Sequence, residues 1–207
     1  MALYLSIVFV AMTIICVVNI FTYNLDAVWV IGAVAISVVV EIAISGLGSL
    51  LCSKSPESWF SPEKKLFKVS KKEQRFYEKI GIKSWKDRVL ELGGLGGFRK
   101  NKINDASSPE YLHRFIMESN KGMVGHIINM FTGFLVVLIL PLGFAWQIGV
   151  PVAIVGSVLN LLPILVLRYN LPKLKIAYKR ASRLEARAKA EIIDSDQMED
   201  EESVQGV

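Results

Sequence analysis

Four long uncharged runs dominate the pattern of hydrophobic and polar positions along the 207-residue chain. They cover residues 3–21, 28–52, 122–140 and 150–167, and Glu41 is the one charged residue within them. A helix needs about 20 apolar residues to cross a bilayer core, where every backbone polar group must be paired internally. The runs therefore predict an all-α polytopic membrane protein with four transmembrane helices, two within 1–52 and two within 122–168. No basic residue precedes the first run and no small-residue cleavage motif follows it, so we expect a retained span rather than a signal peptide.

Lysine and arginine are confined to two parts of the chain. Sixteen of the 24 lie between residues 53 and 121, and the other eight follow residue 167. Because cytoplasmic loops carry the excess of basic residues, this distribution places both regions and both termini in the cytoplasm. Residues 22–27 and 141–149 are then short outer turns. Anionic lipid headgroups account for the net charge of +5, so we expect membrane lipids, and no nucleic acid, as partners.

The segment between the second and third runs, residues 53–121, has the pattern of amphipathic helices on the cytoplasmic membrane surface. Ser70 and Glu73 have the spacing of a capping box, and the helix that they start is expected to end at Gly81. Ser84 is expected to start a second short helix, whose apolar face would consist of Trp85, Val89 and Leu92. Lysines surround both apolar faces, which favours a position against the membrane.

One helix is expected to run from 108 to 140, starting in water and ending in lipid. Ser108 is a suitable N-cap, with Pro109 at the first helical position. Glu118 and His126 lie along this helix, and an ionisable residue at membrane depth is a functional candidate. The two are about 12 Å apart along a continuous helix axis and about 80° apart around it, which is beyond hydrogen-bond reach. A base at His126 would therefore need an orienting partner from another helix.

Two further polar residues interrupt the apolar runs. Glu41 lies about 16 Å from the cytoplasmic end of its run. At that depth it must face the bundle interior, either as a protonated group paired with a neighbouring helix or as part of a substrate site. Asn160 lies near Pro163, which removes a backbone donor.

Two histidines and two separated cysteines offer no metal-ligand spacing. The glycines at 93–97 lack the strand and Lys-Ser or Lys-Thr of a phosphate loop, so we expect a flexible turn there and no tightly bound cofactor.

Charge also organises the end of the chain, residues 169–207. Arg168 lies at the cytoplasmic end of the fourth run, where it either binds a carboxylate or phosphate or extends towards lipid headgroups. Residues 173–193 predict a basic helix, and residues 194–207 predict an acidic disordered tail.

Three motifs resemble the glycosyl-4,4'-diaponeurosporenoate acyltransferase family in their order and spacing. They are IKSWKDR at 82–88, ESNKGMVGHI at 118–127 and NLLPILVLRYNLPKL at 160–174. The resemblance spans roughly residues 59–184. Enzymes of this family esterify a sugar hydroxyl of a carotenoid glycoside with a fatty acyl group. The positions that match the family motifs are Trp85, Lys86, Glu118, His126, Asn160, Pro163, Arg168, Tyr169, Asn170 and Pro172.

The resemblance implies an O-acyltransferase of the bacterial inner membrane that acts on a lipidic hydroxyl acceptor. His126 is then the general base, Glu118 a second catalytic residue that orients a hydroxyl, and acyl-CoA or an acyl-carrier protein the donor. The substrates would be bound by Asn160, Arg168, Tyr169, Asn170, Trp85, Lys86 and Glu41. The alternative is a non-enzymatic four-helix membrane partner or lipid-binding subunit, in which Glu41 and His126 only pair between helices.

Overall fold

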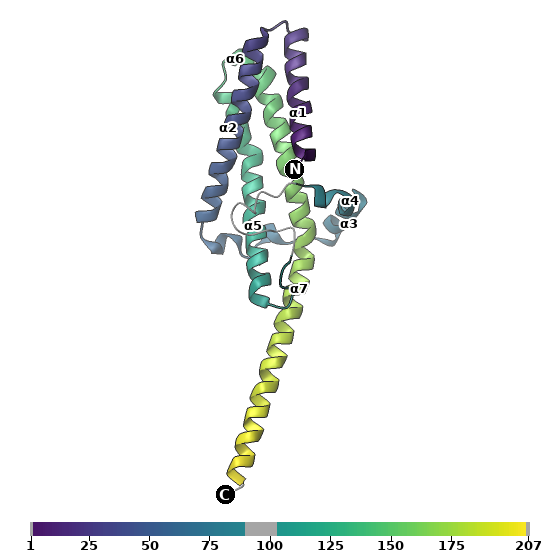
Figure 1. Cartoon of the computed structure of the whole chain (residues 1–207), viewed down its shortest axis with the longest axis vertical. Coiled ribbons are helices and arrows are strands. Elements are labelled where there is room, and N and C mark those ends of the chain that lie inside the picture. Colours follow the sequence, from purple (N-terminus) through teal and green to yellow (C-terminus); the bar gives the residue numbers. More distant parts are fainter. Residues whose placement is uncertain (1, 90–102, 206–207) are drawn as a thin grey trace.

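The computed structural model describes residues 2–89 and 103–205, which form helices and connecting loops without a strand. Four of the helices are long and apolar enough to cross a membrane, which confirms the predicted fold class. They run alternately up and down and pack side by side (Figure 1). Their bounds are α1 Ala2–Val17, α2 Ala27–Lys54, α5 Pro109–Thr132 and α7 Val150–Gln205.

Short helical segments extend or join the four long helices at the end of the bundle away from the C-terminus. A π-helical turn, Val18–Thr22, extends α1, and a 3-10 helix, Gly133–Leu138, extends α5, so the predicted helical path from 108 is nearly continuous. The one-turn helix α6 (Leu142–Phe144) and a second π-helical turn, Ala145–Gly149, lead into α7. The amide of Asn19 joins the two π-helical turns, because it donates to the carbonyl of Gln147 at 3.1 Å.

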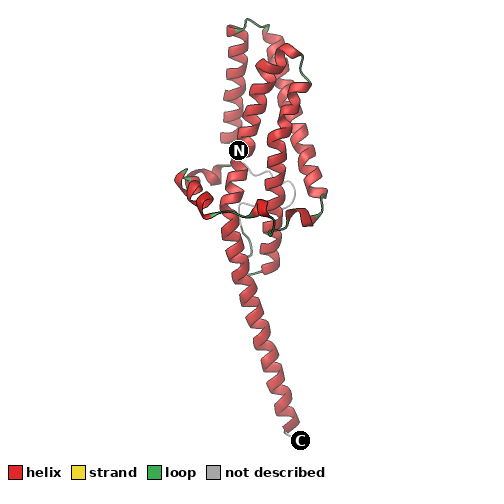
Figure 2. Cartoon of the chain, turned by 180° about the vertical axis from the view of Figure 1, so that it is seen from behind, coloured by secondary structure: helices red, strands yellow, loops and turns green. Residues whose placement is uncertain are grey.

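The opposite end of the bundle carries a layer of short helices, residues 55–89, which we call the peripheral segment. Besides two 3-10 turns, it contains α3 (Lys71–Lys79), α4 (Ile82–Trp85) and the 3-10 turn Lys86–Arg88. Figure 2 shows this segment lying across α5 and α7. The predicted N-cap of α3 is confirmed, since the hydroxyl of Ser70 accepts from the backbone N–H of Glu73 at 3.1 Å. The carboxylate of Glu73 turns to Arg168 of α7.

The second predicted surface helix is shorter and starts earlier than the sequence indicated. Gly81 has a left-handed backbone (φ +63°), which turns the chain into α4 directly after α3. Ser84 is therefore not an N-cap but lies inside α4, where its hydroxyl donates to the carbonyl of Gly81 at 2.8 Å. The chain is extended at Val89. Leu92 and the glycine turn at 93–97 lie outside the described residues.

Most of the large buried side chains lie where the peripheral segment meets the bundle. Phe60 and Phe67 are 2% and 0% exposed, and they pack with aromatic and aliphatic residues of α5 and α7. Two polar side chains also hold the segment from these helices. Asn120 of α5 donates to the carbonyl of Phe60 at 2.8 Å, and Lys175 of α7 donates to the carbonyls of residues 62 and 67. These hydrogen bonds from side chains to loop carbonyls hold the peripheral segment across this end of the bundle.

The structure corrects the prediction of a disordered acidic tail. Helix α7 continues without a break to Gln205 and projects far beyond the other helices (Figure 1). Its last thirty residues contain no glycine or proline and are rich in Ala, Glu, Lys and Arg, which are strong helix formers. No helix-breaking residue separates the basic helix from the acidic segment, so the helix runs on into the segment.

Candidate functional site

The interface between α5 and α7 brings His126 and Asn160 together. The Nδ1 atom of His126 lies 3.0 Å from the Oδ1 atom of Asn160. A second hydrogen bond joins α7 to α5 in the same alignment, because the hydroxyl of Ser157 donates to the carbonyl of Met130 at 2.7 Å. The expectation that His126 finds its partner on another helix is confirmed.

The hydrogen bonds of Asn160 determine which nitrogen of His126 carries the proton. The Nδ2 amide of Asn160 donates to the carbonyl of Gly156 at 3.0 Å, so its Oδ1 is the atom that faces the ring. An amide oxygen only accepts, so Nδ1 of His126 must be the donor. In the neutral ring the lone pair then belongs to Nε2. A histidine oriented in this way can accept a proton from a hydroxyl group.

Glu41 of α2 faces the bundle interior, as predicted, and fills a space that two glycines leave open. A Cβ at Gly133 would lie 3.0 Å from its Oε1, and a Cβ at Gly156 would overlap that atom. Among the described residues, no hydrogen-bond partner reaches this buried oxygen. Gly156 is also the residue whose carbonyl accepts from Asn160, so the carboxyl group of Glu41 lies about one helical turn from the His126–Asn160 pair.

Two other buried oxygen atoms near this level were not identified from the sequence. Asn129 is 5% exposed, and its Oδ1 would lie 2.6 Å from a Cβ at Gly48, which marks a close approach of α2 and α5. Neither this oxygen nor the hydroxyl of Thr132 has a hydrogen-bond partner within the described part of the chain. Single polar residues on an apolar helix give no sequence signal of this kind, because only the packing shows that they point inward.

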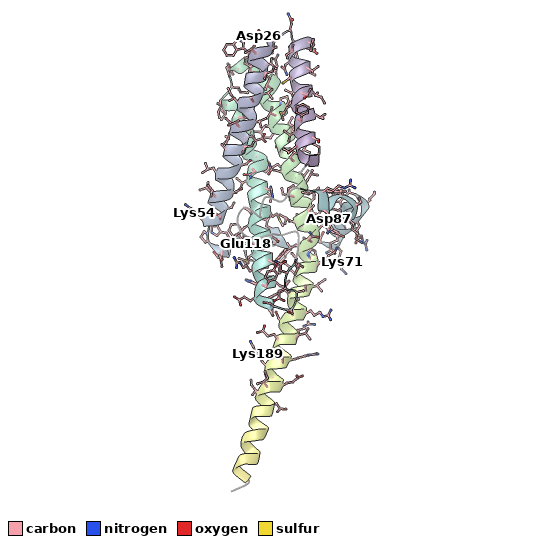
Figure 3. The ribbon with its side chains drawn as sticks, viewed as in Figure 1. Asp26, Lys54, Lys71, Asp87, Glu118 and Lys189 are labelled. Atoms are coloured by element: carbon pink, nitrogen blue, oxygen red, sulfur yellow. The ribbon has the colours of Figure 1, made fainter. Side chains whose placement is uncertain are left out.

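Glu118 lies apart from His126, at the end of the bundle that carries the peripheral segment (Figure 3). Its carboxylate accepts from the ammonium group of Lys121 at 3.0 Å. Lys121 is also 3.8 Å from the carboxylate of Glu57, so it joins α5 to the peripheral segment. The structure therefore places Glu118 in a charge network with Lys121 and Glu57 and not beside the candidate base.

Arg168 was predicted to bind a substrate anion, but the structure directs its guanidinium to groups of its own chain. Its Nε and Nη2 atoms donate to the two carboxylate oxygens of Glu73, the second at 2.9 Å. Its other contacts are the carbonyls of Leu66 and Lys68, at 2.6 and 3.3 Å, and the sulfur of Met123 at 3.8 Å. A guanidinium has five N–H donors, so these contacts engage the whole group, and the carboxylate that Arg168 binds in the structure belongs to its own chain.

Arg168, Glu73 and Tyr77 form a unit that we call the clamp. The hydroxyl of Tyr77 donates to the carboxylate of Glu73. The hydrogen bond from Arg168 is the main reason that the pKa of Glu73 lies below its usual range. Burial, followed by the hydrogen bond to Glu73, raises the pKa of Tyr77 to about 12. The clamp therefore fastens α3 to α7 through a charged, partly buried contact.

The remaining predicted substrate residues also belong mainly to the peripheral packing. Tyr169 is 4% exposed and meets the ring of Tyr77 edge-on. The indole of Trp85 donates to the carbonyl of Ile80 at 3.2 Å, and Lys86 pairs with its neighbour Asp87 at 3.3 Å. Asn170 is half-buried, and no hydrogen bond of its side chain is present in the described part of the chain.

The described residues contain neither a cluster of metal ligands nor a disulfide. Within residues 2–89 and 103–205, no three His, Cys, Asp or Glu side chains lie close enough together to hold an ion. Cys16 and Cys52 are free thiols.

The fold and the His126–Asn160 pair define a helical membrane protein with a candidate acid–base site between two of its spans. The model of the glycosyl-4,4'-diaponeurosporenoate acyltransferase family matches residues 56–180, more than half of the chain. The protein therefore belongs to this family and is an acyltransferase. Neither the curated proteins nor the solved structures give a match. The matched range contains His126, Asn160 and the clamp, whereas α1 and α2, with Glu41, precede it.

Proposed function

We propose that this acyltransferase moves a fatty acyl group from a thioester donor onto a sugar hydroxyl of a carotenoid glycoside. The observation that supports this proposal is the His126–Asn160 hydrogen bond, at 3.0 Å, inside a segment matched by the family model. The alternative of a non-enzymatic membrane partner is set aside, because the family is one of acyltransferases.

In the proposed reaction, His126 is the general base. The acceptor hydroxyl oxygen attacks the carbonyl carbon of the thioester while its proton passes to Nε2 of His126. The tetrahedral intermediate then collapses. The C–S bond breaks, the ester remains on the sugar, and the sulfur takes the proton from His126 and leaves as a thiol. Asn160 keeps the ring in the tautomer that this step requires.

The proposed acceptor end of the site lies between α2 and α5. Glu41, Asn129 and Thr132 place buried oxygens there that have no partner in the described residues. Buried acceptors of this kind are expected to pair, and sugar hydroxyls are donors of the right class. The lipid-facing exterior of the helices provides an apolar path for the acyl chain and the carotenoid tail.

The proposed location is a bacterial cell membrane, with both termini in the cytoplasm. The basic peripheral segment and the projecting end of α7 lie at the same end of the bundle (Figure 3), which the positive-inside rule assigns to the cytoplasm. His126 is about 8 Å along the axis of α5 from Lys121. A cytoplasmic donor, acyl-CoA or an acyl-carrier protein, would therefore need to bring its thioester only a short distance into the membrane.

The direct test is untargeted lipid mass spectrometry on bacterial cells that make the glycosylated carotenoid acid but lack its acyltransferase. Expression of the intact protein is expected to yield a product heavier than the acceptor by one acyl group. Unchanged lipids at a verified level of folded protein in the membrane would overturn the proposed acceptor.

Gly156→Ala is expected to destabilise the protein by about 1–3 kcal/mol, because its new methyl group would overlap the carboxyl group of Glu41, which must then shift within the packed interior of the bundle. Thermal unfolding in detergent measures the effect. Gly32→Ala on α2 is the matched control, since its Cβ would meet no atom within 4 Å. Adding Glu41→Ala to Gly156→Ala should recover part of the loss, and purely additive effects would contradict the predicted overlap.

A further inference from the structure

The end of α7, residues 176–205, which we call the stalk, carries a basic face that the proposed reaction does not use. Its first turns still pack against α5, where the rings of His113 and Tyr178 meet, and the rest projects beyond the bundle. Six side chains at helical spacing form this face: Ile176, Lys179, Arg180, Arg183, Leu184 and Arg187. Ile176 and Leu184 are 68% and 56% exposed, although they are aliphatic. No ion pair within the described residues involves any of the four cations.

We propose that this face docks a small acidic acyl-carrier protein that delivers the acyl thioester to the enzyme. The inference rests on the proposed function, which requires a thioester donor on this side of the membrane. Four cations without an ion pair in the described residues, spaced over little more than two helical turns, fit a row of carboxylates on a partner helix. The two aliphatic residues of the same face fit its apolar side chains.

Lipid headgroups are too far away to be the partner of the whole face. Arg168 marks the end of the membrane run, and Arg183 follows it by about 22 Å along the axis of α7. The attraction of a charged membrane surface falls off within about 10 Å at ordinary ionic strength. In Figure 3 the labelled Lys189, further along the stalk, lies well beyond the end of the bundle.

The acidic end of the chain does not fit this face either. Helix α7 runs without a break to Gln205, so the acidic residues that follow Asp194 continue away from the face. A second copy in the same membrane would project its stalk in the same direction. Parallel stalks would then bring like-charged faces together, which is unfavourable.

The face is also placed correctly for delivery to the site. Ile176 follows Asn160 by about 24 Å along the same helix. A carrier bound there would release its acyl group, held on a flexible arm, at the end of the bundle nearer to His126. A small thioester such as acyl-CoA would not need the outer part of the stalk, so the face favours a protein carrier.

The test measures binding of a purified palmitoyl acyl-carrier protein to the full-length enzyme in nanodiscs made of neutral lipid. Arg180→Glu combined with Arg183→Glu is expected to weaken binding by about tenfold, and added salt should weaken binding of the intact enzyme. Lys189→Glu and Arg183→Glu change the charge equally. Lys189 pairs with Glu185 and lies off the face, so its variant should bind like the intact enzyme while Arg183→Glu binds more weakly.

Three outcomes would overturn the docking proposal. They are absence of carrier binding, equal weakening by the two single variants, and binding of the face to vesicles of anionic lipid but not to the carrier. Acyl transfer from palmitoyl-CoA, assayed on the same samples, tests the proposed function separately. Carrier binding without transfer from either donor would count against the proposed reaction and leave the docking face supported.

Discussion

Replacement of His126 by alanine is expected to lower kcat for acyl transfer by about 10²–10⁴-fold, the usual contribution of a positioned general base. The loss should fall on kcat, because the imidazole is required when the hydroxyl gives up its proton. The measurement is the initial rate of ester formation in nanodiscs, with thermal unfolding of each variant to establish that it is folded. Retention of full activity by folded His126→Ala would remove the base assignment.

Asn160 provides a graded comparison for the same site. Asn160→Ala removes the acceptor for Nδ1–H of His126, so the ring can turn and change its tautomer, and an intermediate loss of kcat is expected. Asn160→Asp keeps an oxygen at that position and should retain more activity than Asn160→Ala.

Glu118→Gln is the contrasting variant, because the carboxylate of Glu118 pairs with Lys121. It should affect KM more than kcat.

The sequence predicted the fold well because the membrane leaves few solutions. Uncharged runs of the right length must become spans, and a carboxylate among them must turn inward, as Glu41 does. It did not predict that Gly133 and Gly156 make the space for that carboxylate. Glycines are common in apolar helices. Whether one of them makes space for a side chain depends on how three helices align, and the sequence of one helix does not determine that alignment.

The site was predicted in its residues but not in its pairings. His126 and Asn160 were both identified, yet their contact depends on how α5 and α7 align. The contact of Arg168 with Glu73 was not predicted, because a cation at the end of a span has several possible partners. No motif links Arg168 to Glu73, which lies 95 positions earlier in the chain. The N-cap at Ser70 was predictable because both of its partners lie within four consecutive residues.

Loss of the clamp is the second large effect that we expect. Arg168→Ala would leave the partly buried carboxylate of Glu73 and the carbonyls of Leu66 and Lys68 without their donor, and should cost about 2–4 kcal/mol of stability. Arg168→Lys keeps the charge but loses the forked bonds, so it should recover only part of the loss. Thermal unfolding in detergent measures both, and unchanged stability of Arg168→Ala would contradict the clamp.

The pH dependence of stability distinguishes the clamp from simple packing. Because the pKa of Glu73 in the folded protein is held below its ordinary value of 4.5, the clamp contributes fully above about 4.5 and is lost as the pH falls through the lowered pKa. Tyr77 acts at the other limit. Its pKa is raised from 10 to about 12, so its contribution is present below pH 10 and is lost as the pH rises towards 12. Glu73→Gln should therefore flatten the acid limb of the unfolding-temperature profile, and Tyr77→Phe the alkaline limb. A packing contact alone would leave both limbs unchanged in these variants, so the two profiles decide whether charge or shape holds the peripheral segment to α7.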